Sequence, residues 1–485
     1  MNTNLDNLSI DILHLKRTKM VCTIGPATDK RHDLEKLVHI GMNVARLNFS
    51  HGTYEEFHRI ISDVRDISEK VHKPIAVMQD LQGPKIRVGK IEEPYEIKTN
   101  SEFYIGKNAP NDKLTIPIQY NFIPFLQSDN LLYFNDAYLK AKVIEIFEEY
   151  ALIRFSNEGV IISNKGINIP DTVILDTKLT EKDANDLQFG MQEDVDYIAL
   201  SFVQTPELVH SVREILKKNN KSDIKIIVKV ETKEALKNID AIIDATDAIM
   251  IARGDLAVEV GLETVPIYQL EITQKCKEKK TPVIVATQML ESMIWNPLPT
   301  RAEVNDVANA TLNKVDAVML SAESAVGKYP FSAVEMMRSI IKTTENGVHL
   351  MKKEHVIYNI KEGSNNSEAI AAAATLLANQ THADLLIVAT KSGKSAHAIS
   401  SLKPNIPIIA ITQDDKVSNQ LALVWGVRSF KINIAITALD DLIEASINIL
   451  MHKHFIRKGS KIIFVTGLHV GIEGETNSLR IIDIA

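Results

Sequence analysis

The sequence predicts an α/β protein whose main body is a parallel β/α barrel, with an all-β domain inserted in it and a second α/β domain after it. Short apolar runs rich in β-branched residues alternate with helical patterns in residues 16–88 and again in residues 176–350, which is typical of parallel βα units. Residues 89–175 hold short alternating runs separated by turn residues, and this pattern predicts a small all-β domain that interrupts the barrel. Residues 351–485 carry their own strands and helices and predict an independent domain, and residues 1–15 predict a polar, partly helical arm.

The individual elements follow from the same patterns in chain order. Before the insertion, the predicted strands are 20–24, 42–49 and 74–79, and the predicted helices are 29–40 and 54–71. Within the insertion, the predicted strands include 113–118, 143–146 and 150–155. After it, the predicted strands are 195–202, 226–230, 248–252, 281–286 and 317–321, with a helix at 207–219. In the last domain, the predicted strands are 384–389, 406–411 and 461–466, with helices at 367–378 and 437–451.

Composition and charge exclude several classes of protein. The 485-residue chain is 45% hydrophobic and has a formal net charge of −7, so it lacks a general nucleic-acid footprint, and a phosphate ligand would need a local basic cluster. Its two cysteines imply no disulfide framework. The N-terminal residues show no apolar signal-peptide core, and no uncharged apolar run approaches the roughly 18 residues of a membrane span. We therefore expect a cytoplasmic protein with no membrane partner.

Charged side chains gather where two expected neighbouring strands end. Lys229 and Glu231 lie at the end of the run 226–230, where strand alternation puts both side chains on one face. The next strand is followed by Gly254 and Asp255. In a parallel β/α barrel, chemistry takes place at the C-terminal strand ends; two carboxylates there suit Mg²⁺, and a lysine beside the metal suits a phosphoryl or enolate oxygen. The alternatives are a solvated Lys-x-Glu pair and a plain Gly-Asp turn.

The stretch from Ile224 to Leu256 resembles the signature of pyruvate kinases, and the resemblance extends from about residue 17 to about residue 480. Further motifs in that family's order are Thr23-Ile24-Gly25-Pro26, 46–52, Gly83-Pro84, 286–293, 299–303 and 319–330. The resemblance implies a TIM (β/α)8 barrel with a β lid domain and a C-terminal α/β domain for effector binding and assembly. It also implies Mg²⁺-dependent phosphoryl transfer from phosphoenolpyruvate to ADP, the last step of glycolysis, which gives pyruvate and ATP.

The resemblance implies a role for each site residue. The catalytic residues would be Lys229, Thr287, Arg46 and Arg87, and Glu231 and Asp255 would ligate Mg²⁺, or Mn²⁺ in its place. Phosphoenolpyruvate would contact Arg46, Lys229, Gly254, Asp255, Thr287 and Ser321, with Glu323 behind Ser321. The nucleotide would contact Pro26, Arg46, His51, Arg87 and Lys165, the last when the lid closes. The alternatives are a strand filler at Thr287 and surface ion pairs at the two arginines.

A third cluster bears on the monovalent cation. Asn48, Ser50 and Asp80 match positions that ligate K⁺ in the family, but Leu81 stands where a fourth ligand, a Thr, is usual, and Lys85 stands where a Glu is usual. This resembles the K⁺-independent branch of the family, in which the ammonium of Lys85 would replace the metal near Asp80. K⁺ would then not be required. The alternative is that Lys85 points to solvent.

The last domain carries a candidate anion site between a strand and a helix. Thr390, Lys391, Ser392, Gly393, Lys394 and Ser395 offer amides, hydroxyls and a lysine at a helix start, and the loop resembles the family's sugar-phosphate effector loop. An ordinary capped turn is the alternative. The resemblance further implies a homotetramer. Departures from the family pattern occur at Gln204, Ala257 and around Asp136.

Two other functions fit parts of the pattern. A Mg²⁺-dependent carbon–carbon lyase acting on a pyruvate enolate would use the two carboxylates, but it would not need Lys229 for phosphoryl transfer or Lys165 in a lid. A non-catalytic effector-binding protein would be expected to have lost at least one of Lys229, Glu231, Asp255 and Thr287.

Overall fold

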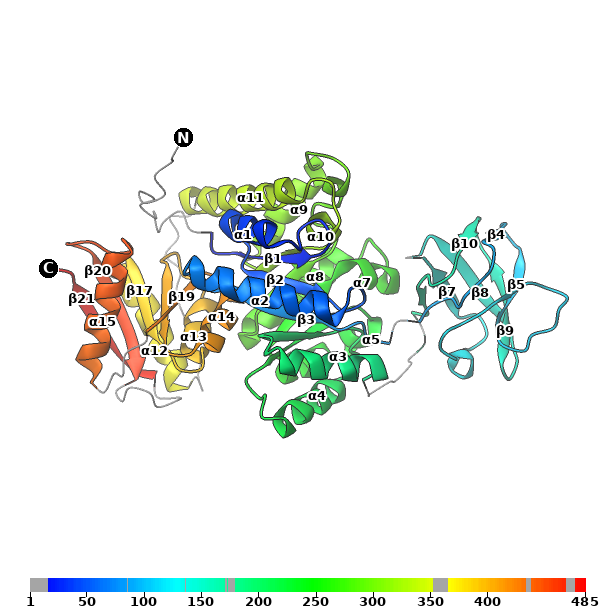
Figure 1. Ribbon diagram of the computed structural model, residues 1–485, viewed down its shortest axis with the longest axis horizontal. Coiled ribbons are helices and arrows are strands. Elements are labelled where there is room, and N and C mark those ends of the chain that lie inside the picture. The colour runs from blue at the N-terminus through cyan, green and yellow to red at the C-terminus, as the bar shows by residue number, and fades with distance from the viewer. Residues whose placement is uncertain are drawn as a thin grey trace.

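The computed structural model describes residues 16–84, 86–135, 137–170, 172, 179–351, 365–432, 438–467 and 476–485. Figure 1 shows three bodies in a row, with the barrel in the middle, the inserted β domain at one end and the C-terminal domain at the other. The predicted arm at 1–15, Lys85 and Asp136 lie outside the described residues. No helix among those residues is both long enough and apolar enough to cross a membrane.

The central body is a closed barrel of eight parallel strands, as predicted. In spatial order its strands are β1 (Lys19–Ile24), β16 (Ala317–Leu320), β15 (Val283–Ala286), β14 (Ala248–Ala252), β13 (Lys225–Val230), β12 (Tyr197–Leu200), β3 (Ala76–Asp80) and β2 (Val44–Asn48). The helices of this part of the chain are α1 (Arg31–Ile40), α2 (Tyr54–Lys70), α3 (Glu181–Gln192), α4 (Pro206–Lys218), α5 (Lys233–Lys237), α6 (Ile239–Ala245), α7 (Arg253–Val260), α8 (Val265–Lys279), α9 (Arg301–Leu312), α10 (Ala322–Ala325) and α11 (Pro330–Met351). Because both faces of each strand are covered, the strands are apolar along almost their whole length.

A repeated polar contact closes the N-terminal edge of the barrel. Asn43, Asp196, Asp247 and Asp316 each directly precede a strand, and each side chain accepts a hydrogen bond from a backbone N–H at the start of the strand before it, with N···O distances of 2.6–3.1 Å. The four contacts join β1 to β2, β3 to β12, β13 to β14 and β15 to β16. The barrel is thus built from four similar two-strand units.

The inserted domain has its own small core. Its main sheet runs in the order β11 (Ile167–Asn168), β7 (Leu131–Phe134), β8 (Leu139–Ile146), β9 (Tyr150–Phe155), β5 (Glu102–Gly106) and β6 (Thr115–Ile116), and a second sheet pairs β10 (Gly159–Ile161) with β4 (Tyr95–Ile97). A separate cluster of buried apolar residues fills it, with Phe122, Phe134 and Phe155 among the largest. The all-β prediction for this segment is confirmed.

The C-terminal domain is a five-stranded sheet flanked by helices. Its strand order is β19 (Val427–Lys431), β18 (Ile408–Thr412), β17 (Leu385–Ala389), β20 (Lys461–Gly467) and β21 (Thr476–Asp483), and only β21 is antiparallel to its neighbour. The helices are α12 (Asn366–Gln380), α13 (Lys394–Ser401), α14 (Asp415–Gln420) and α15 (Leu439–His452). The short turn η5 (Leu421–Leu423) places Leu423 and Ala422 in the apolar cluster that fills the barrel interior. The C-terminal domain therefore closes the N-terminal end of the barrel, which we call the barrel floor.

Candidate active site

Lys229 lies among three oxygen-bearing side chains at the C-terminal end of β13. Its ammonium donates a hydrogen bond to Ser201 Oγ at 2.7 Å and lies 2.9 Å from Glu231 Oε1 and 3.3 Å from Asp80 Oδ1. Only 13% of the Lys229 side chain is exposed. Burial acts to lower the pKa of Lys229, but Asp80 and Glu231 outweigh it and raise that pKa above its ordinary value. Lys229 therefore stays protonated in a site that is largely shielded from solvent.

Glu231 is almost wholly buried beside this lysine. Oε2 accepts a hydrogen bond from the Phe202 amide at 2.6 Å, whereas Oε1 has no hydrogen-bond partner among the described residues beyond its ion pair with Lys229. Burial and the charge of Asp255 raise the pKa of Glu231 despite the nearby ammonium. A buried carboxylate oxygen in this state is suited to a cation, because ionising it without one is costly.

Arg46 and Asp80 form a second charged pair on neighbouring strands. Arg46 Nε donates to Asp80 Oδ2 at 2.7 Å, and Nη1 donates to Thr23 Oγ1 at 2.7 Å. Burial acts to raise the pKa of Asp80, but Lys229 and Arg46 hold it below its ordinary value. Two buried cations therefore meet one ionised carboxylate, which fixes both cations at the C-terminal edge of the barrel.

Arg87 lies away from the ends of the barrel strands. β3 ends at Asp80, and Arg87 lies beyond it at the root of the inserted domain, where it forms an isolated bridge with Gly166 and donates to Asn164 O at 2.9 Å. The Val88 amide donates to Lys165 O at 2.8 Å. Arg87 and Lys165 therefore lie on adjacent chain segments where the insertion joins the barrel.

Gly254, Asp255 and Thr287 follow two neighbouring strands. The Gly254 amide donates to Thr287 Oγ1 at 2.8 Å, and the hydroxyl donates to Ala286 O at 2.6 Å. Gly254 and Asp255 lie in the first turn of α7, and β13 pairs with β14 in parallel. The predicted convergence of Lys229, Glu231 and the 254–255 turn on adjacent strand ends is therefore present.

Ser321 and Glu323 follow β16. Glu323 accepts hydrogen bonds from the backbone amides of Ser321 at 2.7 Å and Leu290 at 3.2 Å, so its carboxylate ties the β15 and β16 loops together. Ser321 Oγ is buried and has no hydrogen-bond partner among the described residues. Next to the strand ends, this hydroxyl is therefore bonded to none of the residues that the structure describes.

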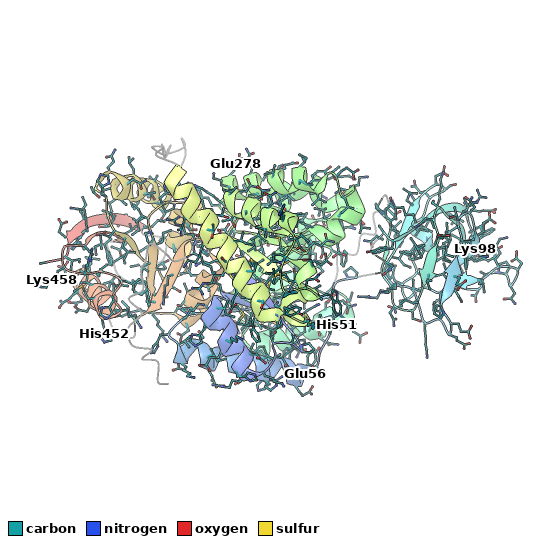
Figure 2. All side chains as sticks on the ribbon, turned by 90° about the horizontal axis from the view of Figure 1, so that it is seen from above. His51, Glu56, Lys98, Glu278, His452 and Lys458 are labelled. Carbon is teal, nitrogen blue, oxygen red and sulfur yellow. The ribbon has the colours of Figure 1, made fainter. Side chains whose placement is uncertain are left out.

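The remaining candidates lie on the rim of the barrel. Pro26 and His51 are exposed beyond β1 and β2, and Figure 2 shows His51 on the part of the barrel that faces the inserted domain. The Ser50 amide donates to Asn48 Oδ1 at 3.2 Å, and Leu81 is buried. The position of Lys85 is not described, so the structure brings together only Asn48, Ser50 and Asp80 of that cluster.

The candidate effector loop connects β17 to α13. Gly393 has a φ of +84°, its amide donates to Thr390 Oγ1 at 3.0 Å, and Ser395 Oγ lies 2.5 Å from Thr476 Oγ1. The loop lines a cavity of about 1420 Å³ that also touches Lys225, Lys280 and other residues of the barrel floor. The cavity therefore has walls from both the C-terminal domain and the barrel.

Sequence reasoning missed two contributors to the site. Ser201 is the nearest hydrogen-bond partner of Lys229, and Arg253 reaches under the Thr287 turn. Arg253 lies within the stretch from Ile224 to Leu256 and Ser201 within the expected strand 195–202, but contacts across the barrel carry no sequence signal. Among the departures from the family pattern, Gln204 is half-buried behind the site, where its carbonyl accepts a hydrogen bond from Asn238, and Ala257 lies within α7.

Comparisons with known proteins agree with this geometry. A family model described as pyruvate kinase, barrel domain, matches residues 15–334, and one described as pyruvate kinase, alpha/beta domain, matches residues 368–482. A protein named pyruvate kinase from Clostridium acetobutylicum is 36% identical over 471 residues, which cover 96% of this chain and 99% of the relative. A pyruvate kinase from Dictyostelium discoideum is 37% identical with 96% and 94% covered, and one from Chlamydia muridarum is 41% identical with 85% and 87% covered. These matches favour neither the lyase nor the non-catalytic alternative, and the chain belongs to the pyruvate kinase family.

Proposed function

We propose that the cluster around Lys229 transfers the phosphoryl group of phosphoenolpyruvate to ADP and leaves an enolpyruvate that is protonated to pyruvate. Membership of the family makes the chain a phosphoryl-transferring enzyme of glycolysis. The observation that carries the assignment to this site is Lys229, a buried cation at a barrel strand end that is paired with the buried carboxylate of Glu231. Positioning and charge neutralisation provide most of the rate in such a transfer.

Glu231 and Asp255 would hold Mg²⁺, or Mn²⁺, at this edge of the barrel. The fit rests on the buried Glu231 oxygen and on the electrostatic effect of Asp255 on Glu231. Two carboxylates suffice for Mg²⁺, because it commonly takes one or two carboxylates plus substrate oxygens. When bound, the metal supplies positive charge that polarises the phosphoryl and carboxylate oxygens.

The cationic side chains would act on two different sets of phosphate oxygens, those of the transferred phosphoryl group and those of the nucleotide. Lys229 and Arg46, both buried, would stabilise the phosphoryl group during transfer, as fixed donors in a site of low dielectric. Arg87 and Lys165, at the root of the inserted domain, would meet the nucleotide phosphates when that domain closes. Pro26 and His51 would border the nucleotide on the rim.

The other side of the substrate would face the β14 and β15 turns. The backbone at Gly254 and Asp255 would bind the substrate carboxylate, with the Ser321 hydroxyl as a further contact. Thr287, whose hydroxyl is fixed by the Gly254 amide, would lie on the path that delivers a proton to the enolate carbon.

We further propose that the protein belongs to the K⁺-independent branch. The substitutions at Leu81 and Lys85 support this, as does the contact of Asp80 with two fixed cations. Lys85 would add a third positive charge near the Asn48–Ser50 loop. Under this proposal the enzyme requires Mg²⁺ but does not require K⁺.

The regulatory proposals concern the C-terminal domain and assembly. The loop of residues 390–395 would bind a phosphorylated effector, and residues 351–485 would form the effector and assembly domain beside the barrel parts 16–88 and 176–350 and the lid 89–175. The protein would work as a cytoplasmic homotetramer. Exposed apolar side chains on the stretch from α7 to α9, such as Leu262, Ile267, Trp295 and Leu298, support burial against another subunit.

One assay tests the function and the cation proposal together. Pyruvate formation from phosphoenolpyruvate, ADP and Mg²⁺ is measured in buffer free of K⁺ and NH₄⁺, and again after K⁺ is added. We expect full turnover without K⁺ in the parent, and K⁺-dependent turnover in Lys85→Glu. Turnover of the parent only with K⁺ would remove the K⁺-independent assignment and leave the enzyme assignment standing. No turnover under either condition, with sugar phosphates and AMP supplied, would contradict the function.

A further inference from the structure

The turn that follows β15 has an unusual backbone. Thr287 has a φ of +67° and Gln288 a φ of +53°, so two successive non-glycine residues occupy the left-handed region. For a β-branched residue such as Thr287 this conformation is a genuine outlier, because its side chain crowds the backbone. Such conformations persist only where surrounding contacts hold them. The turn therefore needs a restraint.

Arg253 forms several contacts with this turn. Its Nη2 donates to Thr287 O at 2.7 Å and to Gln288 O at 3.1 Å, and the same atom lies 2.8 Å from Met289 Sδ. Nη1 forms an ion pair with Asp306 of α9 at 2.7 Å. Only 10% of the Arg253 side chain is exposed. A planar guanidinium can join two carbonyls to a carboxylate in this way, whereas the single ammonium of lysine cannot keep the same geometry.

The same two loops are joined a second time at the hydroxyl. Gly254 directly follows Arg253, and its amide donates to Thr287 Oγ1 at 2.8 Å. A Cβ at Gly254 would lie 3.5 Å from that oxygen, so the backbone of one loop passes close to the side chain of the other. Arg253 therefore holds the Thr287 carbonyl, while its neighbour Gly254 holds the Thr287 hydroxyl.

We propose that Arg253 is a positioning residue for the protonation half of the reaction. It holds Thr287 in the left-handed turn, so that the hydroxyl stays on the proton path. The inference rests on the proposed function, which gives Thr287 that place. In this step the C2–C3 π pair of the enolate forms the new C3–H bond, the C2 oxygen becomes the carbonyl of pyruvate, and solvent replaces the delivered proton. Phosphoryl transfer relies on Lys229, whose described contacts do not include Arg253.

The test separates the two halves of the reaction in Arg253→Lys. Phosphoryl transfer is measured as ATP formed in the first turnover after rapid mixing with phosphoenolpyruvate, ADP and Mg²⁺. Protonation is measured in reverse, as the exchange of pyruvate methyl protons for deuterium in heavy water with Mg²⁺ and ATP, followed by NMR. We expect methyl exchange to fall by about 100-fold and first-turnover ATP formation by less than about 10-fold. Equal falls, or unchanged methyl exchange, would overturn the proposal.

A matched control uses the same substitution at the opposite end of the barrel. Arg213 Nη2 also joins a carbonyl, that of Ala245 at 2.9 Å, to a carboxylate, that of Asp247 at 2.8 Å. Arg213→Lys is expected to leave the ratio of methyl exchange to first-turnover ATP formation at the parent value. A ratio that falls as far in Arg213→Lys as in Arg253→Lys would show a general effect of loosening the barrel and would overturn the proposal.

A double-mutant cycle tests the restraint itself. Glycine adopts positive φ freely, so Gln288→Gly lowers the strain that Arg253 is proposed to hold. In that background, Arg253→Lys is expected to lose several-fold less methyl exchange than in the parent, and an equal loss in both backgrounds would overturn the proposal.

A second variant covers the case in which Arg253→Lys does not fold. Asp306→Asn releases the far end of the guanidinium and is expected to lower the same ratio by a smaller factor, and an unchanged ratio there would also overturn the proposal. A parent protein that forms neither ATP nor pyruvate would remove the proposed function and this inference together. Normal turnover with an unchanged ratio would remove this inference alone.

Discussion

Asp80 is the carboxylate that pairs with both buried cations of the site, Arg46 and Lys229. Its carboxylate meets Arg46 at 2.7 Å and Lys229 at 3.3 Å, and both cations are largely buried. In the proposed mechanism these are the cations that face the phosphoryl group, so Asp80 keeps them paired before substrate arrives. Burial without such a partner lowers the pKa of a lysine and favours its neutral form.

Lys73, at the opposite end of the barrel, shows what happens to a buried lysine that forms no ion pair with a carboxylate among the described residues. Lys73 precedes β3, and its Nζ donates to Val38 O at 2.7 Å and to Met42 O at 2.9 Å. Burial, with the charges of Arg428 and Lys19, lowers the pKa of Lys73 to about 7. In the unfolded chain a lysine has a pKa of about 10.4.

This difference predicts a pH dependence of stability. Between about pH 7 and about pH 10.4 the unfolded state binds more protons at Lys73 than the folded state, so the free energy of unfolding rises with pH across this window. This gain in stability is complete above the pKa of Lys73 in the unfolded chain, and it is lost as the pH falls to the pKa of Lys73 in the folded protein. Lys73→Met is expected to flatten that rise, measured by urea unfolding at several pH values. Lys19 also has a lowered pKa and adds a slope of the same sign, so the variant is expected to keep part of the rise in unfolding free energy. A rise as steep in the variant as in the parent would contradict the assignment to Lys73.

At the scale of elements, the three aspartates among the strand-opening side chains on the barrel floor are paired in different ways. Asp196 pairs with Arg65 at 2.8 Å, and Asp247 with Arg213 at 2.8 Å, both from barrel helices. Asp316 instead pairs with a residue of the C-terminal domain, Lys403, at 2.7 Å. The last two-strand unit of the barrel thus takes its cation from the neighbouring domain.

Lys403→Met is therefore expected to destabilise the protein. The substitution leaves Asp316 buried without its cation, and breaking a buried pair in this way costs about 3–5 kcal/mol. Lys416→Met is the matched control, because Lys416 also reaches from the C-terminal domain to the barrel, but its partner Asp194 is half exposed, and the expected loss is at most about 1 kcal/mol. Urea unfolding of both variants is the measurement, and equal losses would show that Asp316 does not depend on Lys403.

The elements themselves were largely predictable, because buried strands and amphipathic helices leave local patterns. All eight barrel strands lie where apolar runs occur, although the expected strand 195–202 is shorter, since β12 ends at Leu200 and Phe202 turns to a positive φ. The convergence of Lys229, Glu231 and Asp255 was predictable from strand order. The left-handed turn at Thr287 was not, because contacts distant in sequence hold it.

At the scale of the whole molecule, one segment connects the candidate effector loop to the barrel. A Cβ at Gly393 would lie 3.5 Å from Leu421 and 3.7 Å from Val417, among other side chains, and Leu423 enters the barrel interior two residues after Leu421. Gln420 adds hydrogen bonds, since its carbonyl accepts from Tyr197 Oη and its Nε2 donates to Asp223 O, both at 2.7 Å. An effector in the loop would therefore act on the barrel through its floor. Sequence alone could not predict this connection, because an apolar Leu423 is equally consistent with the core of its own domain.

Lys394→Ala is expected to blunt activation by a phosphorylated sugar. Loss of a charge-assisted contact to phosphate should raise the half-activating concentration by at least about tenfold, with basal turnover unchanged. Lys458→Ala is a suitable control, because Lys458 is exposed on the far side of the C-terminal domain (Figure 2). Activation curves of the three proteins give the comparison, and a curve for Lys394→Ala that overlies that of the parent would contradict the effector assignment.

The most direct test of the whole account is the turnover of Lys229→Met beside Lys225→Met. Both lysines lie on β13, Lys229 at the active-site end and Lys225 at the floor, 3.5 Å from Asp247. Pyruvate formation from phosphoenolpyruvate and ADP is measured at saturating Mg²⁺, with circular dichroism to establish that both variants fold. We predict that Lys229→Met loses at least about 10²–10³-fold in kcat while Lys225→Met stays within about threefold of the parent. A folded Lys229→Met protein with parental turnover would contradict the assignment of phosphoryl transfer to this site.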